Sequence, residues 1–328
     1  MSLNRVVSGM RPTGRLHIGH YHGVLENWID IQDHFESFFF VADWHSLTTE
    51  YGDTSGIRSS AREMVLDWVA FGLNPEKCTI FEQSQVPQHA ELNLILGMIT
   101  PVAWLERNPT YKEMLENIEQ RDLSTFGFLG YPVLMAADII LYRATRVPVG
   151  HDQLPHLEIT REIARRFNYL YQTPVFPEPE ALLTETPKLL GLDGRKMSKS
   201  YNNSIYLSET AEETAVKIKG MVTDTQRVRK ADPGDPDVCL AFNLHQLYVS
   251  EDVRAKIIPA CRSAEIGCVE CKRILTEAMN AALAPFRAKR EELAASSGFV
   301  DEILAHGSAK ASVVAKETMA AVRDALKV

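Results

Sequence analysis

Two short segments of the chain carry residue types that suit phosphate chemistry. The first, residues 9–20, follows the apolar pair Val6 and Val7 and leads into a helical pattern, which indicates a strand, a glycine-rich turn and a helix. Its glycines, which we expect to take left-handed angles and to admit a ligand, are Gly9, Gly14 and Gly19. We expect the start of the helix, with His17 and His20, to contact phosphates. An ordinary turn with surface histidines is the alternative.

The second segment is Lys-Met-Ser-Lys-Ser at residues 196–200, preceded by a turn at residues 192–195. Lysine supplies a flexible point charge and serine a short hydrogen-bond donor, so this composition suits a phosphate leaving group. We expect residues 192–203 to form a mobile loop. A solvated basic loop would explain the segment equally well if it stood alone.

The two segments lie about 180 residues apart, and together they resemble the two signatures of the class I aminoacyl-tRNA synthetases. In that family both signatures bind ATP, and the second closes over pyrophosphate as the amino acid carboxylate attacks the α-phosphate. The resemblance implies catalytic roles for His17, His20, Lys196, Ser198 and Lys199, together with Mg²⁺. It implies ATP contacts from Arg11, Thr13, Gly19, His20, Gly150, His151, Asp152, Lys196, Met197, Ser198, Lys199 and Ser200. His151 stands where the family commonly has an acid.

A helical pattern over residues 131–142 places one carboxylate among apolar side chains. Its face consists of Met135, Asp138, Ile139 and Tyr142. A buried carboxylate needs a partner. One interpretation of Asp138 is an acid at a helix end or a structural ion pair, for which the candidates are Arg143, Arg146 and Arg161.

This segment, with Val-Pro-Val-Gly-His-Asp-Gln at residues 147–153, resembles the tryptophanyl branch of the family. In that branch the helical Asp accepts the indole N–H, which is the role the resemblance implies for Asp138. Further roles follow for Tyr131 and Gln153 at the amino group, for Met135, Ile139, Val147 and Val149 at the ring, and for His45 and Val7 at two further pocket positions.

The elements that must position these residues alternate between strand and helix. Strand patterns occupy residues 37–42 and 78–81, and an amphipathic helix occupies residues 58–72. This rhythm predicts an α/β fold, a Rossmann-like doubly wound parallel sheet with ligands at the carboxyl ends of its strands.

Residues 84–130 interrupt this alternation of strand and helix patterns. Residues 92–99 and 102–105 look helical, and residues 124–130 look like a loop. In the family the matching insertion joins the two halves of the fold and forms a homodimer interface, so we expect a homodimer. A buried core helix is the alternative interpretation.

Beyond residue 203 the patterns are helical, and we expect an all-helical second domain over residues 204–328 after a catalytic domain over residues 1–203. Helical spacing marks residues 209–221, 251–258, 271–286 and 312–326. The resemblance implies that this domain contacts the anticodon of tRNA(Trp) and that the last helix packs back on the catalytic domain.

Four of the five cysteines fall in the helical part: Cys239, Cys261, Cys268 and Cys271. Buried thiols are the usual explanation of scattered cysteines, but a C-x-x-C beside two more favours a four-sulfur metal site. Some tryptophanyl enzymes carry an iron–sulfur cluster on a nearly identical pattern, with a first gap one residue longer. We therefore expect a [4Fe–4S] cluster, with Zn²⁺ as the alternative.

Composition fits an enzyme of this size. The 328 residues, 45% hydrophobic and 24% charged, can form a sizeable core in two domains. We find no signal-peptide pattern and no apolar run long enough to span a membrane, and we expect a cytoplasmic location. The net charge of −8 is compatible with a nucleic-acid partner, because phosphate contacts need only a local basic surface. Basic residues gather late in the chain, at Lys217, Lys219, Arg227, Arg229, Lys230, Lys272, Arg273, Arg287, Lys289 and Arg290.

The sequence thus predicts ATP-dependent activation of L-tryptophan and its transfer to tRNA(Trp). The tyrosyl branch is one alternative, because it shares the fold and the signatures. A non-enzymatic tRNA-binding or redox-sensing protein derived from a synthetase is the other. Intact signatures argue against the second alternative.

Overall fold

The computed structural model describes residues 4–109, 111–112, 124–183 and 189–328. By its internal contacts the chain divides into two compact units. The sheet unit comprises Met1–Gly14, Asn27–Glu185 and Ser297–Val328, and the helical unit comprises Arg15–Glu26 and Thr186–Ser296. This division differs from the expected boundary at residue 203, because the second part of the first signature, from Arg15 on, groups with the helical unit and the last 32 residues, Ser297–Val328, with the sheet unit.

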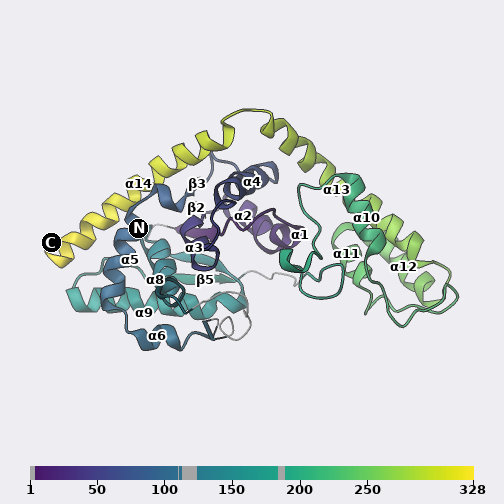
Figure 1. Cartoon of the computed structure of the whole chain (residues 1–328), viewed down its shortest axis with the longest axis horizontal. Coiled ribbons are helices and arrows are strands. Elements are labelled where there is room, and N and C mark those ends of the chain that lie inside the picture. The colour runs from purple at the N-terminus through teal and green to yellow at the C-terminus, as the bar shows by residue number, and fades with distance from the viewer. Residues whose placement is uncertain (1–3, 110, 113–123, 184–188) are drawn as a thin grey trace. The chain divides into compact units, whose positions relative to one another are not determined.

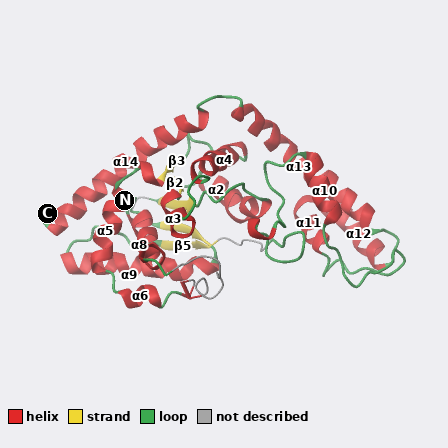
Figure 2. Cartoon of the chain, in the orientation of Figure 1, coloured by secondary structure: helices red, strands yellow, loops and turns green. Residues whose placement is uncertain are grey.

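The sheet unit is built on a parallel sheet, whose strands are yellow in Figure 2. Five strands form it, in the order β3-β2-β1-β4-β5. They are β1 Arg5–Met10, β2 Glu36–Val41, β3 Thr79–Glu82, β4 Arg146–Val149 and β5 Glu180–Leu183. The order runs outward from β1 in both directions, which is the doubly wound topology that the alternating patterns predict. The α/β fold class is confirmed.

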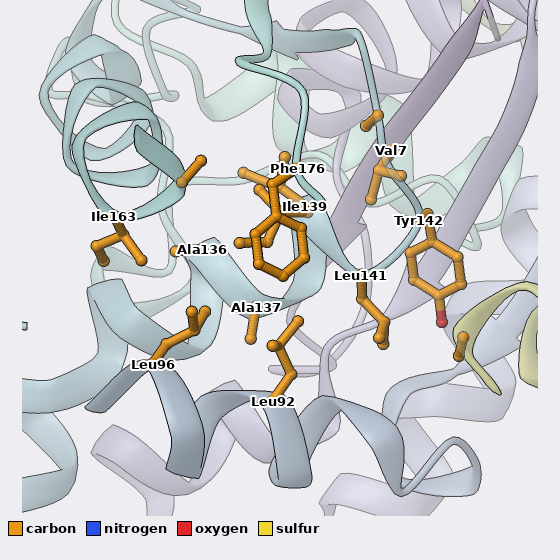
Figure 3. Close-up of a cluster of buried hydrophobic side chains, with 14 of the residues drawn as sticks. Val7, Leu92, Leu96, Ala136, Ala137, Ile139, Leu141, Tyr142, Ile163 and Phe176 are labelled. Atoms are coloured by element: carbon orange, nitrogen blue, oxygen red, sulfur yellow. The ribbon is translucent and has the colours of Figure 1, made fainter. Parts of the chain in front are cut away.

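Helices cover the sheet. In the sheet unit they are α2 Glu26–Ile31, α3 Asp43–Glu50, α4 Ile57–Ala70, α5 Gln88–Ile99, α6 Val102–Glu106, α8 Phe126–Ile140, α9 Leu154–Tyr171 and α14 Phe299–Leu326. Apolar faces of α5, α8 and α9 pack with the strands into one buried cluster (Figure 3). Val7, Ile139 and Phe176 belong to this cluster, which fixes α8 against the sheet.

Helix α8 begins earlier than expected. Residues 124–130 were expected to form a loop, but the helix starts at Phe126 and runs through three of the expected loop's apolar residues. The Thr125 side chain accepts a hydrogen bond from the Phe128 N–H and so caps the helix. The loop prediction was wrong over residues 126–130 because burial of Phe128 and the Thr125 cap outweigh the low helix propensity of Gly127 and Gly130.

Helix α14 runs along the edge strand β3 (Figure 1). It starts at Phe299, not near residue 312. The closest approach is at Gly307, where a Cβ would lie 1.8 Å from the Ile80 carbonyl oxygen, so only glycine fits. Ion pairs Arg62–Asp301 and Arg323–Glu91 flank this contact. The helix therefore protects an edge strand from pairing with other chains.

The helical unit contains α1 Ile18–His20, a π turn at Tyr21–Leu25, α10 Ala211–Gly220, α11 Leu240–Tyr248, α12 Glu251–Arg262 and α13 Cys268–Ala294. A capping box between Thr210 and Glu213 starts α10. Helix α13 extends in both directions beyond the expected residues 271–286. No helix in the described ranges is long and apolar enough to cross a membrane.

Candidate active site

The first signature is held in place by the chain that follows the second. Ile18 N–H donates to the Ile205 carbonyl at 3.0 Å, and Leu207 N–H donates to the Leu16 carbonyl at 2.9 Å. The imidazole rings of His17 and His20 lie 3.8 Å apart between centroids. The structure therefore brings His17 and His20 close to the second signature inside the helical unit, although most of the chain separates them in sequence.

Both signature histidines are neutral at physiological pH. Burial, assisted by the charge of Lys199, lowers the pKa of His17 to about 4. Burial, with His17 and Lys199 nearby, also lowers the pKa of His20 well below its ordinary value. Neutral imidazoles can donate hydrogen bonds to phosphate oxygens, while Lys199 supplies the positive charge.

The glycines of the first signature differ in what they do. Only Gly14 takes a positive φ, +101°, as expected. The prediction was wrong for Gly9 and Gly19, whose small size serves packing. A Cβ at Gly9 would lie 2.4 Å from the Phe40 ring, and one at Gly19 would lie 2.9 Å from the His17 ring.

The second signature lies in a loop built around one buried residue, Asn203, which is 2% exposed. Its Oδ1 accepts from the Ser198 N–H at 2.8 Å. Its Nδ2 donates to the Lys196 carbonyl at 3.2 Å and to Asp193 Oδ1 at 2.7 Å. Gly194, with φ +85°, turns the chain as the sequence predicts. Asn203 thus fixes the backbone that carries the two lysines, a role that the sequence reasoning missed.

Charged and aromatic side chains brace the same loop. The Arg195 guanidinium pairs with Asp193 at 2.6 Å and lies 4.1 Å from the centre of the Tyr201 ring. Hydrogen bonding from Asn203, with help from Arg195, lowers the pKa of Asp193 to about 2. Lys196 is exposed, and Met197 is buried beneath the loop. The loop therefore presents Lys196 to solvent, with the buried Met197 side chain beneath it.

In the sheet unit, Asp138 is the centre of a buried polar network. It is 2% exposed and accepts hydrogen bonds from His45 Nε2 at 2.7 Å, Gln83 Nε2 at 2.7 Å and His89 Nδ1 at 2.6 Å. Burial opposes its ionisation, but the bonds from the two histidines outweigh burial and lower the pKa of Asp138. The partners are therefore not the arginines considered from sequence.

Tyr131 also has a buried partner. Its hydroxyl lies 2.5 Å from His156 Nε2. Burial lowers the pKa of His156 to about 4 and raises the pKa of Tyr131 to about 12, so the pair consists of a neutral imidazole and a neutral phenol. His156 Nε2 accepts a hydrogen bond from the phenolic O–H, and Asn108 forms a second side-chain hydrogen bond with the Tyr131 hydroxyl.

The expected ring-contact residues cluster in the sheet unit. Val7, Ile139, Val147 and Val149 belong to the buried core, and Met135 packs against it. Gln153 ends the short helix His151–Gln153, and its amide donates to Asp152. The expected ATP-binding residues are divided: Arg11, Thr13, Gly150, His151 and Asp152 belong to the sheet unit, whereas Gly19, His20 and residues 196–200 belong to the helical unit.

The four clustered cysteines line a single pocket in the helical unit, together with Asp224 and Arg227. Cys261 stands near the end of α12, and Cys268 and Cys271 stand in the first turn of α13. Burial raises the pKa of Cys271 to about 12. Among the described residues, no group of three or more His, Cys, Asp or Glu side chains is arranged to hold a metal ion.

Comparison with known proteins identifies the family. The model of the family described as tRNA synthetases class I (W and Y) matches residues 2–284. A Thermotoga maritima protein named Tryptophan--tRNA ligase is 51% identical, covering 98% of this chain and 98% of its own length. A protein of the same name from Aquifex aeolicus is 45% identical, covering 98% and 99%. The chain belongs to the tryptophanyl-tRNA synthetases.

The fold of this synthetase agrees. A tryptophanyl-tRNA synthetase from Campylobacter jejuni, whose structure is described as complexed with ADP and tryptophan, superimposes with a TM-score of 0.89 at 32% identity. The match covers 99% of this chain and 100% of that one. The residues that sequence reasoning missed in the synthetase are Gln83, His89, His156 and Asn203, each a buried partner of a residue that the resemblance had selected.

Proposed function

We propose that this synthetase activates L-tryptophan with ATP to tryptophanyl-adenylate and transfers the tryptophanyl group to tRNA(Trp). The observation that carries the proposal is Asp138, a buried carboxylate that two histidines and a glutamine keep ionised on the helix that also carries apolar Met135 and Ile139. Such a group can accept the indole N–H, and a ligand without that donor leaves it unpaired. The relatives' names support the same substrate. The tyrosyl branch would need partners for a phenol hydroxyl at this place.

The chemistry is divided between positioning and charge stabilisation. In our proposal Asp138 and the surrounding apolar residues hold the ring, and Tyr131 and Gln153 hold the amino group. His17 and His20 contact the phosphates as neutral donors, while Lys196, Ser198 and Lys199 stabilise the charge of the departing pyrophosphate. Mg²⁺ enters with ATP as part of the substrate and adds positive charge at the phosphates.

Pyrophosphate exchange with each aromatic amino acid tests the substrate. We expect exchange with tryptophan and, from loss of the hydrogen bond alone, rejection of phenylalanine by about 10⁴-fold. Asp138→Ala should weaken tryptophan and relax that discrimination together. Exchange that prefers tyrosine, or discrimination that survives in Asp138→Ala, would contradict the proposal. Because charged tRNA is used by ribosomes in the cytoplasm, we propose a cytoplasmic location.

We further propose that the synthetase is a homodimer. Large apolar side chains stay exposed on α5 and the neighbouring segments: Leu94, Met98, Val102 and Phe126. Each lies within the insertion that the family resemblance places at a dimer interface. A second copy of the same surface would bury these side chains and stabilise the pair.

We also propose that the four cysteines hold a [4Fe–4S] cluster. Four thiols lining one pocket form a donor set that fits it. A [4Fe–4S] cluster and a single zinc ion both accept four thiolates, and the resemblance to tryptophanyl enzymes with a nearly identical cysteine pattern favours the cluster. Arg227 Nη1 lies 4.0 Å from Cys261 Sγ and 3.9 Å from Cys268 Sγ and would balance part of the cluster's negative charge.

Anaerobic purification tests the cluster. Brown protein with about four iron and four sulfide per chain is expected, and removing the cluster should impair tRNA charging more than exchange. A colourless preparation with one zinc per chain would refute the iron–sulfur cluster but retain the four cysteines as metal ligands. Four freely titrating thiols in the native protein would contradict any metal site.

A further inference from the structure

The two oxygens of the Asp138 carboxylate have different surroundings. Within the part of the chain that the structure describes, Oδ1 accepts from both Gln83 and His89, which fills its lone pairs, whereas Oδ2 accepts from His45 alone. The His89 side chain is fully buried, and the His45 side chain is 12% exposed. Oδ2 is therefore the oxygen with room for one more donor, and it lies on the side where a ligand can enter.

His89 is held by a second contact. Its Nε2 lies 2.7 Å from the Tyr142 hydroxyl, which is also fully buried. Because ionised Asp138 can only accept, His89 must carry its proton on Nδ1, and its Nε2 must then accept from the tyrosine O–H. Rings of Phe40 and Phe81 lie 5.9 and 6.0 Å from the imidazole and exclude other partners at its faces.

We propose that Tyr142 and His89 are specificity-determining positioning residues that aim Oδ2 of Asp138 at the indole N–H. The Tyr142 hydroxyl donates to Nε2 and so holds the His89 ring in the orientation in which Nδ1 donates to Oδ1, and that bond sets the rotation of the carboxylate. Without the hydroxyl, the buried Nε2 loses its donor, so the ring can shift, the bond to Oδ1 weakens and the carboxylate can turn. The proposal rests on the proposed function, in which Asp138 accepts the indole N–H.

A purely structural role is the competing explanation, since buried polar groups need partners in any protein. The two explanations differ in what they predict for the ligand. A structural defect weakens every amino acid that uses the pocket. A misdirected Oδ2 weakens only ligands that donate a hydrogen bond to it. β-(3-Benzothienyl)alanine has nearly the shape of tryptophan, with sulfur in place of the indole N–H, and so separates them.

The first experiment measures pyrophosphate exchange by wild type and Tyr142→Phe with both amino acids. We expect kcat/KM for tryptophan to fall about 10-fold in the variant, mainly through KM, because roughly one hydrogen bond is lost. The values for benzothienylalanine should stay within about twofold on the same ground. Tyr171→Phe is the matched control, since Tyr171 also packs against the sheet-unit core but lies outside the network.

The second experiment compares His89→Asn with His89→Gln. An asparagine amide reaches the place of ring Nδ1 and can donate to Asp138, whereas a glutamine amide reaches the place of Nε2, beside Tyr142. We expect Asn to keep most of the preference for tryptophan over benzothienylalanine and Gln to lose it. Thermal melting of all variants reports folding independently.

Three results would overturn the proposal that Tyr142 and His89 position the Asp138 carboxylate. They are an equal loss for both amino acids in Tyr142→Phe, an unchanged preference in that variant, and a His89→Gln protein that discriminates as well as His89→Asn. The proposed function fails separately, because wild type without tryptophan-dependent exchange would overturn it whatever the variants do.

Discussion

Asn203 gives the sharpest prediction for the phosphate chemistry. The change Asn203→Ala removes the acceptor of the Ser198 N–H and the donor to the Lys196 carbonyl, both in the loop that carries the signature lysines. Each such hydrogen bond contributes about 0.5–1.5 kcal/mol, so the loop conformation loses about 1–3 kcal/mol, or roughly 5- to 150-fold in population. The bond to exposed Asp193 is left out of this sum because water replaces it.

The assay is pyrophosphate exchange at saturating ATP and tryptophan, with tryptophan binding measured by equilibrium dialysis. We expect kcat to fall by the factor above while tryptophan affinity stays unchanged, because Asn203 belongs to the helical unit and Asp138 to the sheet unit. Gly191→Ala should act in the same direction, since a Cβ there would lie 2.2 Å from the Asn203 amide nitrogen.

Asn202→Gly is the control for this experiment. Asn202 adjoins the same loop and has φ +49°, which glycine adopts without strain. This variant therefore removes a side chain next to Asn203 but leaves the side-chain hydrogen bonds of Asn203 in place. A kcat for Asn203→Ala within twofold of wild type, with both proteins folded, would refute the idea that this residue positions the lysines.

Three further changes test other parts of the molecule. Lys199→Ala should lower exchange by roughly two orders of magnitude with tryptophan binding intact, because its contact with pyrophosphate tightens in the transition state; an unchanged rate would remove Lys199 from catalysis. Burial lowers the pKa of His156 to about 4, below the unfolded value of about 6.5, so its contribution to stability is complete above pH 6.5 and falls by up to about 3 kcal/mol as pH drops toward 4. Melting temperatures of His156→Gln should therefore decline less than those of wild type over this window, and parallel curves would contradict the assignment. Met98→Glu on α5 should yield monomers in sedimentation, whereas Val216→Glu on exposed α10 should not; equal behaviour of the two variants would argue against the proposed dimer surface.

Local patterns were sufficient for most of the elements. The strand expected at residues 37–42 is β2, Glu36–Val41, and the helix expected at residues 58–72 is α4, Ile57–Ala70. Strand β2 is a continuous buried run, and the buried residues of α4 recur at helical spacing, as at Ala61, Met64, Val65 and Trp68, so pattern and packing agree. Strand β5, Glu180–Leu183, went unpredicted because its side chains are half-buried or exposed and its place in the sheet depends on pairing with β4.

Residues that act through long-range contacts were harder to find. Asn203 lies three residues beyond the second signature, but nothing in its neighbourhood shows that its side chain turns back to bond Ser198 and Lys196. Likewise, the division of the chain assigns the two histidines of the first signature to the helical unit because Ile18 and Leu16 pair with residues 205 and 207. A pairing between segments so distant in sequence produces no local hydrophobic periodicity from which it could be predicted.

The partners of Asp138 show where sequence reasoning could have gone further. The candidates considered were arginines near Asp138 in sequence, yet the observed donors are 93, 55 and 49 residues away. All three follow the carboxyl ends of strands: β2 ends at Val41 before His45, and β3 ends at Glu82 before Gln83 and His89. Because a doubly wound sheet gathers those ends at one edge, its topology predicts that polar residues after β2 and β3 meet. A search for donors just beyond each expected strand would therefore have selected the two histidines and the glutamine, and would have rejected the nearby arginines.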